Sequence, residues 1–445
     1  MHFINIIFFG GFFMRKRYFL ITFAIITIIA GVWVWACKHP FGPGIPKKVD
    51  KVDEINDSIV PLTGSGGGLN VHGYTLPQNS LSQEEQDEEY DPDFNNTILF
   101  SGRNIPALTV TSNGVILATA GTDNGPITVK RSSDMGKTWS TVTVNGSSSG
   151  SGYIHPFFIN CHNGDILLGV VSNNAGSKTT IIYRGKNDGQ TWNVATNISF
   201  SEICNDTKEC FVTYGQGITL RHGANVNAKK LMFPYFYYNT TNGKFTATML
   251  SEDDGETFKN NFNNGGRNSY GTFNTYETKF IELCNGDILL NMRTSFTDMA
   301  FWMKSTDYGK TWSITTDNKA PQESENVKHA DFTRYEFSGK DIKNNGSKYA
   351  LAIFSSYTGN SYTVKMTTND FNNGAKNNKY HFIRELVNES GREDGYPAIT
   401  VLPDGTIATL TEENSSDIVF RRFNLSWLTY QDNKIDYSKD LKYQN

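Results

Sequence analysis

The stretch SSDMGKTW, residues 132–139, recurs as SEDDGETF at 251–258 and as STDYGKTW at 305–312. The three copies share the pattern Ser-x-Asp-x-Gly-x-Thr-aromatic, and GKNDGQTW at 185–192 is a degenerate fourth copy. An Asp carboxylate that accepts turn amide hydrogens, a Gly in the left-handed region and an aromatic ring packed beneath would lock a hairpin turn. The repeats therefore argue for a fold rather than for a chemistry.

The spacing of the repeats predicts the architecture. Their glycines are 53, 66 and 54 residues apart, which suits one four-stranded blade per interval. From Ile98 onward the chain consists of short β-rich runs with Asn-Gly or Asp-Gly turns, such as TVTSNGVILA at 109–118 and TVLPDGTIATL at 400–410. At this spacing, residues 97–430 hold about six blades. We predict an all-β, six-bladed β-propeller over residues 96–432.

The N-terminal part predicts export. Arg15, Lys16 and Arg17 precede an uncharged run at 18–36, which as a helix would nearly span a bilayer. Basic residues before such a run stay cytoplasmic, so the rest of the chain is expected outside. Residues 1–37 are expected to be a membrane anchor, a lipoprotein signal ending at Cys37, or a signal for soluble secretion.

Composition limits the possible partners and cofactors. Residues 38–95 are polar and rich in Gly and acidic groups, so they are predicted to be a flexible linker, and residues 433–445 a C-terminal tail. The formal net charge of -4 leaves no basic excess, and we expect no nucleic-acid partner. The sequence contains no cofactor motif and no zinc-ligand spacing, so neither a cofactor nor a metal is expected.

Five segments resemble one enzyme family in both order and spacing. They are NIPALTVTSNGVILA (104–118), GQGITLRHGANVNAKKLMFPYFYY (215–238), TYETKFIELCNGDILLNMR (275–293), GYPAITVLPDGTIATLTEE (395–413) and FRRFNLSWL (420–428). With the repeats, which match the family's Asp boxes, they make the chain similar to the bacterial exo-α-sialidases. The resemblance implies an enzyme that removes terminal sialic acids from glycans or glycolipids at the cell surface.

The resemblance assigns three catalytic roles. A sialoside carries a carboxylate on its anomeric carbon, which would repel a carboxylate nucleophile, and the family uses a neutral tyrosine instead. Tyr396 is implied as that nucleophile, Glu277 as the base that activates it, and Asp123 as the acid/base for the leaving group. Taken alone, these residues would be interpreted as a core aromatic, a solvated strand residue and a turn former.

The arginines that clamp the substrate carboxylate in the family are incompletely matched. Arg293 in LLNMRTS matches one of them, whereas Arg103 stands one place too early in its strand and reaches the site only if a bulge corrects the register. No arginine occupies the third place, at 358–360. Glu412 matches the carboxylate that steadies the opening arginine. His155 is either a sugar contact or a satisfied structural histidine.

Two other functions remain open at this point. The incomplete clamp is compatible with a hydrolase of a related acidic sugar. A glycan-binding propeller without turnover is the other alternative, although such a protein has no need of an activated phenol.

Overall fold

A computed structural model of the chain describes residues 70–71, 74–75, 95–172, 179–199, 207–222, 229–239, 243–261, 275–283, 285–294, 301–314, 327–337, 340–341, 352–358, 361–367, 382–388, 395–414, 416–423 and 427–428. The predicted signal or anchor segment 1–37 and the predicted tail 433–445 lie outside these residues. Within the described ranges, no helix is both long and apolar enough to cross a membrane.

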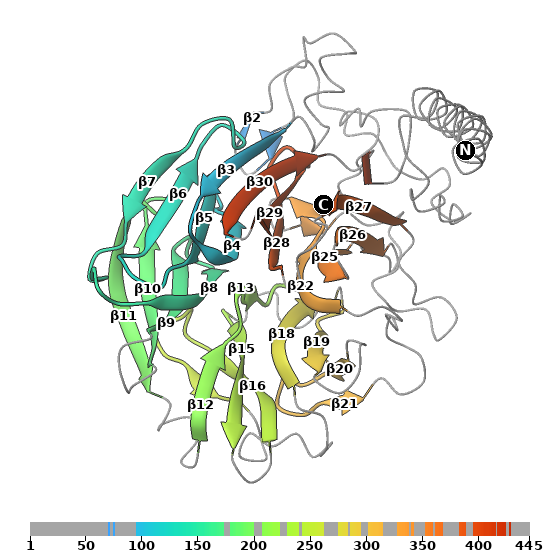
Figure 1. Cartoon of the computed structure of the whole chain (residues 1–445). Helices are drawn as coiled ribbons and strands as arrows, with labels where there is room; N and C mark the ends of the chain where they lie inside the picture. The colour runs from blue at the N-terminus through green and yellow to red at the C-terminus, as the bar shows by residue number, and fades with distance from the viewer. Residues whose placement is uncertain are drawn as a thin grey trace, which may run out of the picture. The chain divides into compact units, whose positions relative to one another are not determined.

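Six sheets of four or five strands make up most of the described chain (Figure 1). Two further sheets have two strands each, β1 (Asn70–Val71) with β2 (Tyr74–Thr75) and β23 (Glu336–Phe337) with β24 (Lys340–Asp341). The first three large sheets contain β4 (Asn104–Val110), β5 (Ile116–Gly121), β6 (Thr128–Ser132) and β7 (Ser140–Thr143); β8 (Tyr153–Asn160), β9 (Ile166–Ser172), β10 (Thr179–Lys186), β11 (Thr191–Ser199) and β13 (Gly215–Gln216); and β12 (Thr207–Val212), β14 (Ile218–Thr219), β15 (Leu231–Asn239), β16 (Gly243–Ser251) and β17 (Lys259–Asn260).

The remaining three large sheets follow the same meander. They contain β18 (Thr275–Glu282), β19 (Ile288–Thr294), β20 (Phe301–Ser305) and β21 (Ser313–Ile314); β22 (Val327–Arg334), β25 (Ala352–Thr358), β26 (Ser361–Thr367) and β27 (Phe382–Asn388); and β28 (Pro397–Val401), β29 (Ile407–Glu413), β30 (Asp417–Phe423) and β3 (Asn96–Phe100). The predicted all-β class is confirmed.

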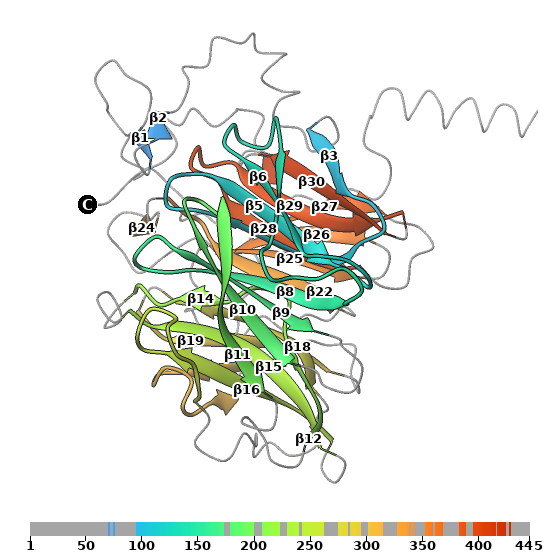
Figure 2. The ribbon, with the colours of Figure 1, turned by 90° about the vertical axis from the view of Figure 1, so that its left-hand side faces the viewer.

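The sheets contact one another in a closed order. β4 contacts β8, β8 contacts β14, β15 contacts β18, β18 contacts β22, β22 contacts β28, and β28 contacts β4. The ring is closed by the first long strand, because β3 pairs antiparallel with β30 near the end of the chain (Figure 2). Radial repetition with such a closure leaves only short sheet edges, and the fold is a β-propeller.

The three Ser-x-Asp-x-Gly-x-Thr repeats adopt one turn geometry, each between the third and fourth strand of a sheet. In the first, Asp134 Oδ1 accepts the Thr138 amide at 2.9 Å, and Gly136 donates its N–H to Ser132 Oγ at 2.8 Å. The other two repeats reproduce both bonds within 0.1 Å. Gly136 has φ +87°, the left-handed region that favours glycine. The repeats thus lock hairpins, as the sequence predicts.

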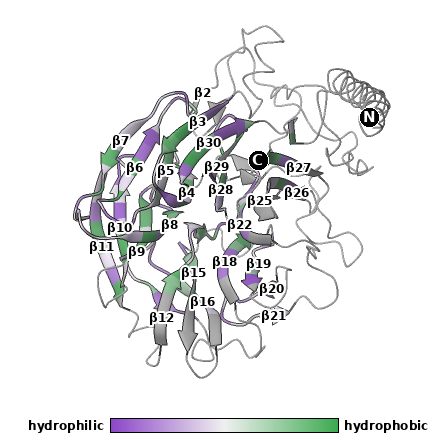
Figure 3. Cartoon of the chain, viewed as in Figure 1, coloured by the Kyte–Doolittle hydropathy of each residue, from purple (hydrophilic) through white to green (hydrophobic). Residues whose placement is uncertain are grey.

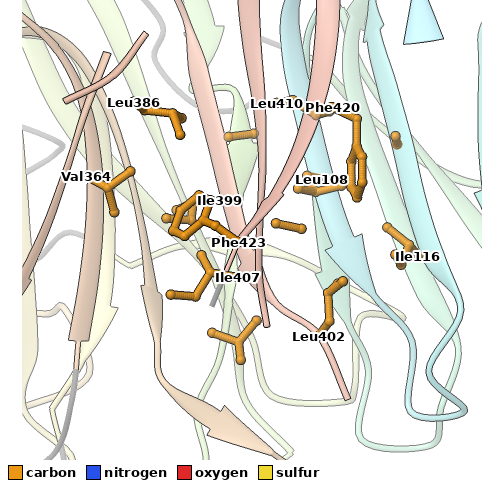
Figure 4. Close-up of a cluster of buried hydrophobic side chains, with 14 of the residues drawn as sticks. Leu108, Ile116, Val364, Leu386, Ile399, Leu402, Ile407, Leu410, Phe420 and Phe423 are labelled. Carbon is orange, nitrogen blue, oxygen red and sulfur yellow. The ribbon is translucent and has the colours of Figure 1, made fainter. Parts of the chain in front are cut away.

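Hydrophobic side chains fill the spaces between neighbouring sheets. One cluster joins the sheet of β28–β30 to those of β4 and β25–β26, and includes Leu108, Ile399, Leu410 and Phe420, all at most 1% exposed (Figure 4). The middle strands β5 and β9 are mainly apolar and are buried at every position (Figure 3). Burial on both faces is expected where each sheet packs between two others, and each large aliphatic side chain buried there stabilises the fold by roughly 1.5–3 kcal/mol.

Candidate active site

The predicted nucleophile and base lie at the same end of two inner strands. Tyr396 directly precedes β28, and Glu277 lies near the start of β18. The register of β18 against β19 shifts between Thr275 and Thr278, which leaves one extra residue there. A β-bulge of this kind re-aims side chains at the rim of a sheet. Here it places Glu277 opposite Arg293, which stands one residue before the end of β19.

Tyr396 and Glu277 form a hydrogen-bonded pair. The Tyr396 hydroxyl donates to Glu277 Oε1 at 3.2 Å. Burial and then the Glu277 charge raise the pKa of Tyr396, with Arg293 opposing them. Burial would also raise the pKa of the Glu277 carboxyl, but the positive charges of His329, Arg293 and His155 outweigh it and lower this pKa to about 2. The pair is therefore a neutral phenol beside an ionised carboxylate that can accept its proton.

Arg293 holds the other side of the same carboxylate. Its Nη1 donates to Glu277 Oε2 at 3.1 Å, and 29% of its side chain is exposed. The same Nη1 lies 2.5 Å from Nε2 of His329. A partly exposed guanidinium anchored at one nitrogen can present its plane to a carboxylate ligand.

His329, on β22, is a part of the site that the sequence analysis missed. It is 2% exposed, and its Nδ1 lies 3.1 Å from the carbonyl oxygen of Gly395. A carbonyl oxygen only accepts, so Nδ1 carries the proton and Nε2 accepts from Arg293, which is the pattern of a neutral ring. The positive charge that lowers the Glu277 pKa most is that of the His329 ring when it is protonated, followed by that of Arg293.

Three buried side chains, those of Tyr214, Lys279 and Asp331, pack behind Tyr396. The Tyr214 ring meets the Tyr396 ring edge-on at 4.8 Å, and its hydroxyl donates to Ala330 O at 2.9 Å. Lys279 lies 3.6 Å above the Tyr214 ring and 3.4 Å from Asp331. Lys279 and Asp331 each stand two residues after a site residue in their strands. Residues two apart in a strand lie on the same face, so Glu277 shares a face with Lys279 and His329 shares one with Asp331. This period of two is the sequence signal that could have found Lys279 and Asp331.

The bulge that Arg103 requires is present. β4 pairs Asn104 with Gly121 and Pro106 with Ala120, so Ile105 is an extra residue, with φ +53°. The Ile105 N–H donates to Glu412 Oε2 at 3.2 Å, so the predicted stabilising carboxylate sits against this bulge. Arg103 is partly buried, and its Nη1 has no hydrogen-bond partner among the described residues. Burial lowers the pKa of Arg103.

His155 occupies the corresponding bulge in β8. It has φ +52°, is 8% exposed, and its Nδ1 lies 3.0 Å from Val212 O. The rings of Phe211 and Phe236 lie 5.7 and 6.4 Å away. These contacts give the imidazole a hydrogen-bond partner and a packed environment, as expected of a structural histidine. The positive charge of His155 also lowers the pKa of Glu277.

Asp123 lies in the exposed loop between β5 and β6. Its neighbour Thr122 forms a bridge to Tyr153 at the start of β8, and Gly121 pairs with Asn104 at the start of β4. The loop therefore belongs to the end of the sheets that carries Tyr396 and Glu277. This position leaves the carboxylate open to solvent and to a ligand.

A polar cavity of about 500 Å³ lies at the opposite end of the inner strands. Its lining includes the last residues of four inner strands. These are Asn160 of β8, Glu282 of β18, Arg334 of β22 and Val401 of β28. None of the predicted catalytic residues lines it. Tyr396 and Glu277 therefore lie at the other end of the propeller.

Comparisons with known proteins place the fold of the chain among known structures. No family model matches the chain, and no curated protein is similar to it in sequence. Solved structures do match: a Hadza microbial sialidase with a TM-score of 0.54, 19% identity, and coverage of 77% of this chain and 67% of the other. The fold is that of the sialidases.

Two more sialidase-fold structures support the same conclusion. The intramolecular trans-sialidase from Ruminococcus gnavus, solved with oseltamivir carboxylate, matches with a TM-score of 0.55 at 14% identity, covering 75% of this chain and 97% of that one. Trypanosoma rangeli sialidase, solved with sialic acid, matches with a TM-score of 0.54 at 18% identity, covering 88% and 60%. At these identities the sialidase fold is shared, and activity is a separate question.

Proposed function

We propose that this protein is a retaining exo-α-sialidase that hydrolyses terminal sialic acids on glycans or glycolipids. The observation that carries the proposal is the Tyr396 hydroxyl 3.2 Å from Glu277 Oε1, with Arg293 bound to the other carboxylate oxygen. A propeller that only bound glycans would not need a phenol paired with a buried base. The sialidase fold of the chain supports the same conclusion.

In the first step, the Tyr396 oxygen attacks the anomeric carbon while its proton passes to Glu277. Because the raised pKa of Tyr396 disfavours a free phenolate, proton transfer accompanies the formation of the carbon–oxygen bond. Asp123 donates a proton to the departing glycosidic oxygen. The products are a glycosyl-tyrosine and the released alcohol.

In the second step, Asp123 removes a proton from water as the water oxygen attacks the anomeric carbon. The Tyr396 oxygen leaves and recovers its proton from Glu277. Two displacements at one carbon retain its configuration. Glu277 is ionised in the resting site, and because its lowered pKa makes it a weak base, it takes the phenol proton only as the carbon–oxygen bond forms.

Substrate binding is assigned to the cationic part of the site. Arg293 would bind the anomeric carboxylate through planar paired hydrogen bonds. Arg103 would add a second contact from the bulged start of β4, next to Glu412, and His155 is proposed to line the sugar pocket. No cofactor or metal takes part in these steps.

The decisive test is hydrolysis of a fluorogenic α-sialoside by the full-length chain in detergent, beside Tyr396→Phe. We expect the wild type to release the fluorophore, with the α-anomer as the first product seen by NMR, and the variant to bind sialic acid without turnover. Binding without release by the wild type would instead identify a glycan-binding propeller. Release from a different acidic sugar alone would identify the related hydrolase.

The remaining architecture is part of the same proposal. We assign one blade to each of the six large sheets, which gives a six-bladed propeller over residues 96–432. Residues 18–36 are proposed to hold the propeller at the outer surface of the membrane, through linker 38–95. Fractionation and protease shaving of intact cells test this location, because a cytoplasmic propeller would be protected.

A further inference from the structure

His329 is fixed on three sides within the site. Its ring lies face to face with the Tyr396 ring, with centroids 3.7 Å apart and planes inclined by 17°. Its Nε2 lies 2.5 Å from Arg293 Nη1, and its Nδ1 lies 3.1 Å from Gly395 O. Gly395 directly precedes Tyr396, so one buried imidazole contacts both the ring of the proposed nucleophile and the backbone that carries it.

The contact with Arg293 fixes the plane of its guanidinium. Nη1 is held between Glu277 Oε2 and His329 Nε2, at 3.1 and 2.5 Å. A planar group held at one nitrogen by two acceptors keeps its orientation toward a ligand. Orientation matters here because residues 358–360 are Thr, Gly and Asn, so no arginine stands there to share the substrate carboxylate.

The contact with Tyr396 fixes the phenol. His329 covers one face of its ring, and the edge of the Tyr214 ring meets it at 4.8 Å. Aromatic pairs of these kinds add stabilising free energy beyond that expected from the apolar area that they bury. The phenol is thereby kept in the position that places its hydroxyl 3.2 Å from Glu277.

We propose that His329 is a positioning residue with two separable actions: its Nε2 orients Arg293 for the substrate carboxylate, and its ring face aligns Tyr396 for attack. The inference rests on the proposed sialidase function. It assigns binding to one part of the imidazole and turnover to another, which a histidine that only filled space would not do.

Three variants separate the actions. In His329→Gln the side-chain amide replaces Nε2 but not the ring face, so KM should stay within about threefold while kcat falls about tenfold. In His329→Phe the ring face remains and the acceptor is lost, so KM should rise about 10- to 100-fold with a smaller change in kcat. His329→Asn replaces only the Nδ1 donor, so both constants should worsen.

The controls distinguish positioning from folding. His162→Gln changes a partly buried histidine at the opposite end of the inner strands and should leave both constants unchanged. Thermal unfolding and calorimetric binding of sialic acid are measured for every variant. Unchanged constants, or equal losses of kcat and kcat/KM in all three His329 variants, would overturn this inference while leaving the sialidase function standing. A wild type that neither cleaves sialosides nor binds sialic acid would overturn both.

Discussion

Glu277 and Arg293 face each other across the β18–β19 hairpin, with 3.1 Å between Oε2 and Nη1. The other carboxylate oxygen accepts from Tyr396, so one side chain links the proposed nucleophile to the proposed carboxylate ligand. In the proposed mechanism, substrate binding and proton transfer are thus coupled through a single group.

Glu277→Gln should lower kcat for sialoside hydrolysis by about 10²–10⁴-fold, because a neutral amide cannot take the phenol proton. KM should rise as well, since Arg293 loses its anionic partner. Steady-state kinetics on an aryl sialoside measure both. Glu385→Gln, on the exposed side of β27, is the matched control and should behave as wild type. Full activity of Glu277→Gln would remove it from the mechanism.

The same substitution predicts a pH-dependent difference in stability. The Glu277 pKa lies at about 2 in the fold, below the ordinary 4.5. A depressed pKa stabilises the fold above about pH 4.5, and this contribution disappears as the pH falls toward 2. The free energy of unfolding of wild type minus that of Glu277→Gln should therefore be constant from pH 5 to 7 and shrink below about pH 4.5. Urea unfolding at each pH tests this, and a difference that does not change with pH would contradict it.

Asp123→Asn should affect substrates according to their leaving groups. An alcohol leaving group needs a proton, whereas a phenol with strongly electron-withdrawing substituents leaves without one. We expect kcat/KM for a natural sialyl-galactoside to fall about 10²–10⁴-fold, and that for an activated aryl sialoside much less. Equal losses on both substrates would assign the general acid to another residue.

Gly136→Ala should be more destabilising than Gly150→Ala. Both glycines have left-handed φ, +87° and +92°, so both variants carry a backbone cost of about 1 kcal/mol. A Cβ at Gly136 would lie 2.4 Å from the buried Phe420 ring, whereas a Cβ at Gly150 meets nothing within 4 Å. The clash should add about 1–3 kcal/mol. If the two variants unfold at the same urea concentration, the Phe420 ring moves away from the new Cβ without destabilising the fold.

Several residues of the candidate site could be named from the sequence because a short pattern surrounds each of them. Tyr396 precedes an Asp-Gly hairpin, and Glu277 opens a strand that ends in an Asn-Gly hairpin with Arg293 on its return. Hairpin partners stand opposite each other, so sixteen residues of sequence already bring Glu277 and Arg293 together. His329 and Tyr214 have no such pattern. Their contacts join residues 36 to 182 positions apart in the chain.

By itself, the sequence determined the hairpins, the locked turns and the propeller, because turn geometry and strand alternation are set by neighbouring residues. Only the tertiary structure decided the site. The bulge at Ile105, which the Arg103 register requires, arises from strand pairing and not from local preference. Likewise, the stacking of His329 on Tyr396 exists only because the ring of sheets brings the starts of β22 and β28 to one end of the molecule.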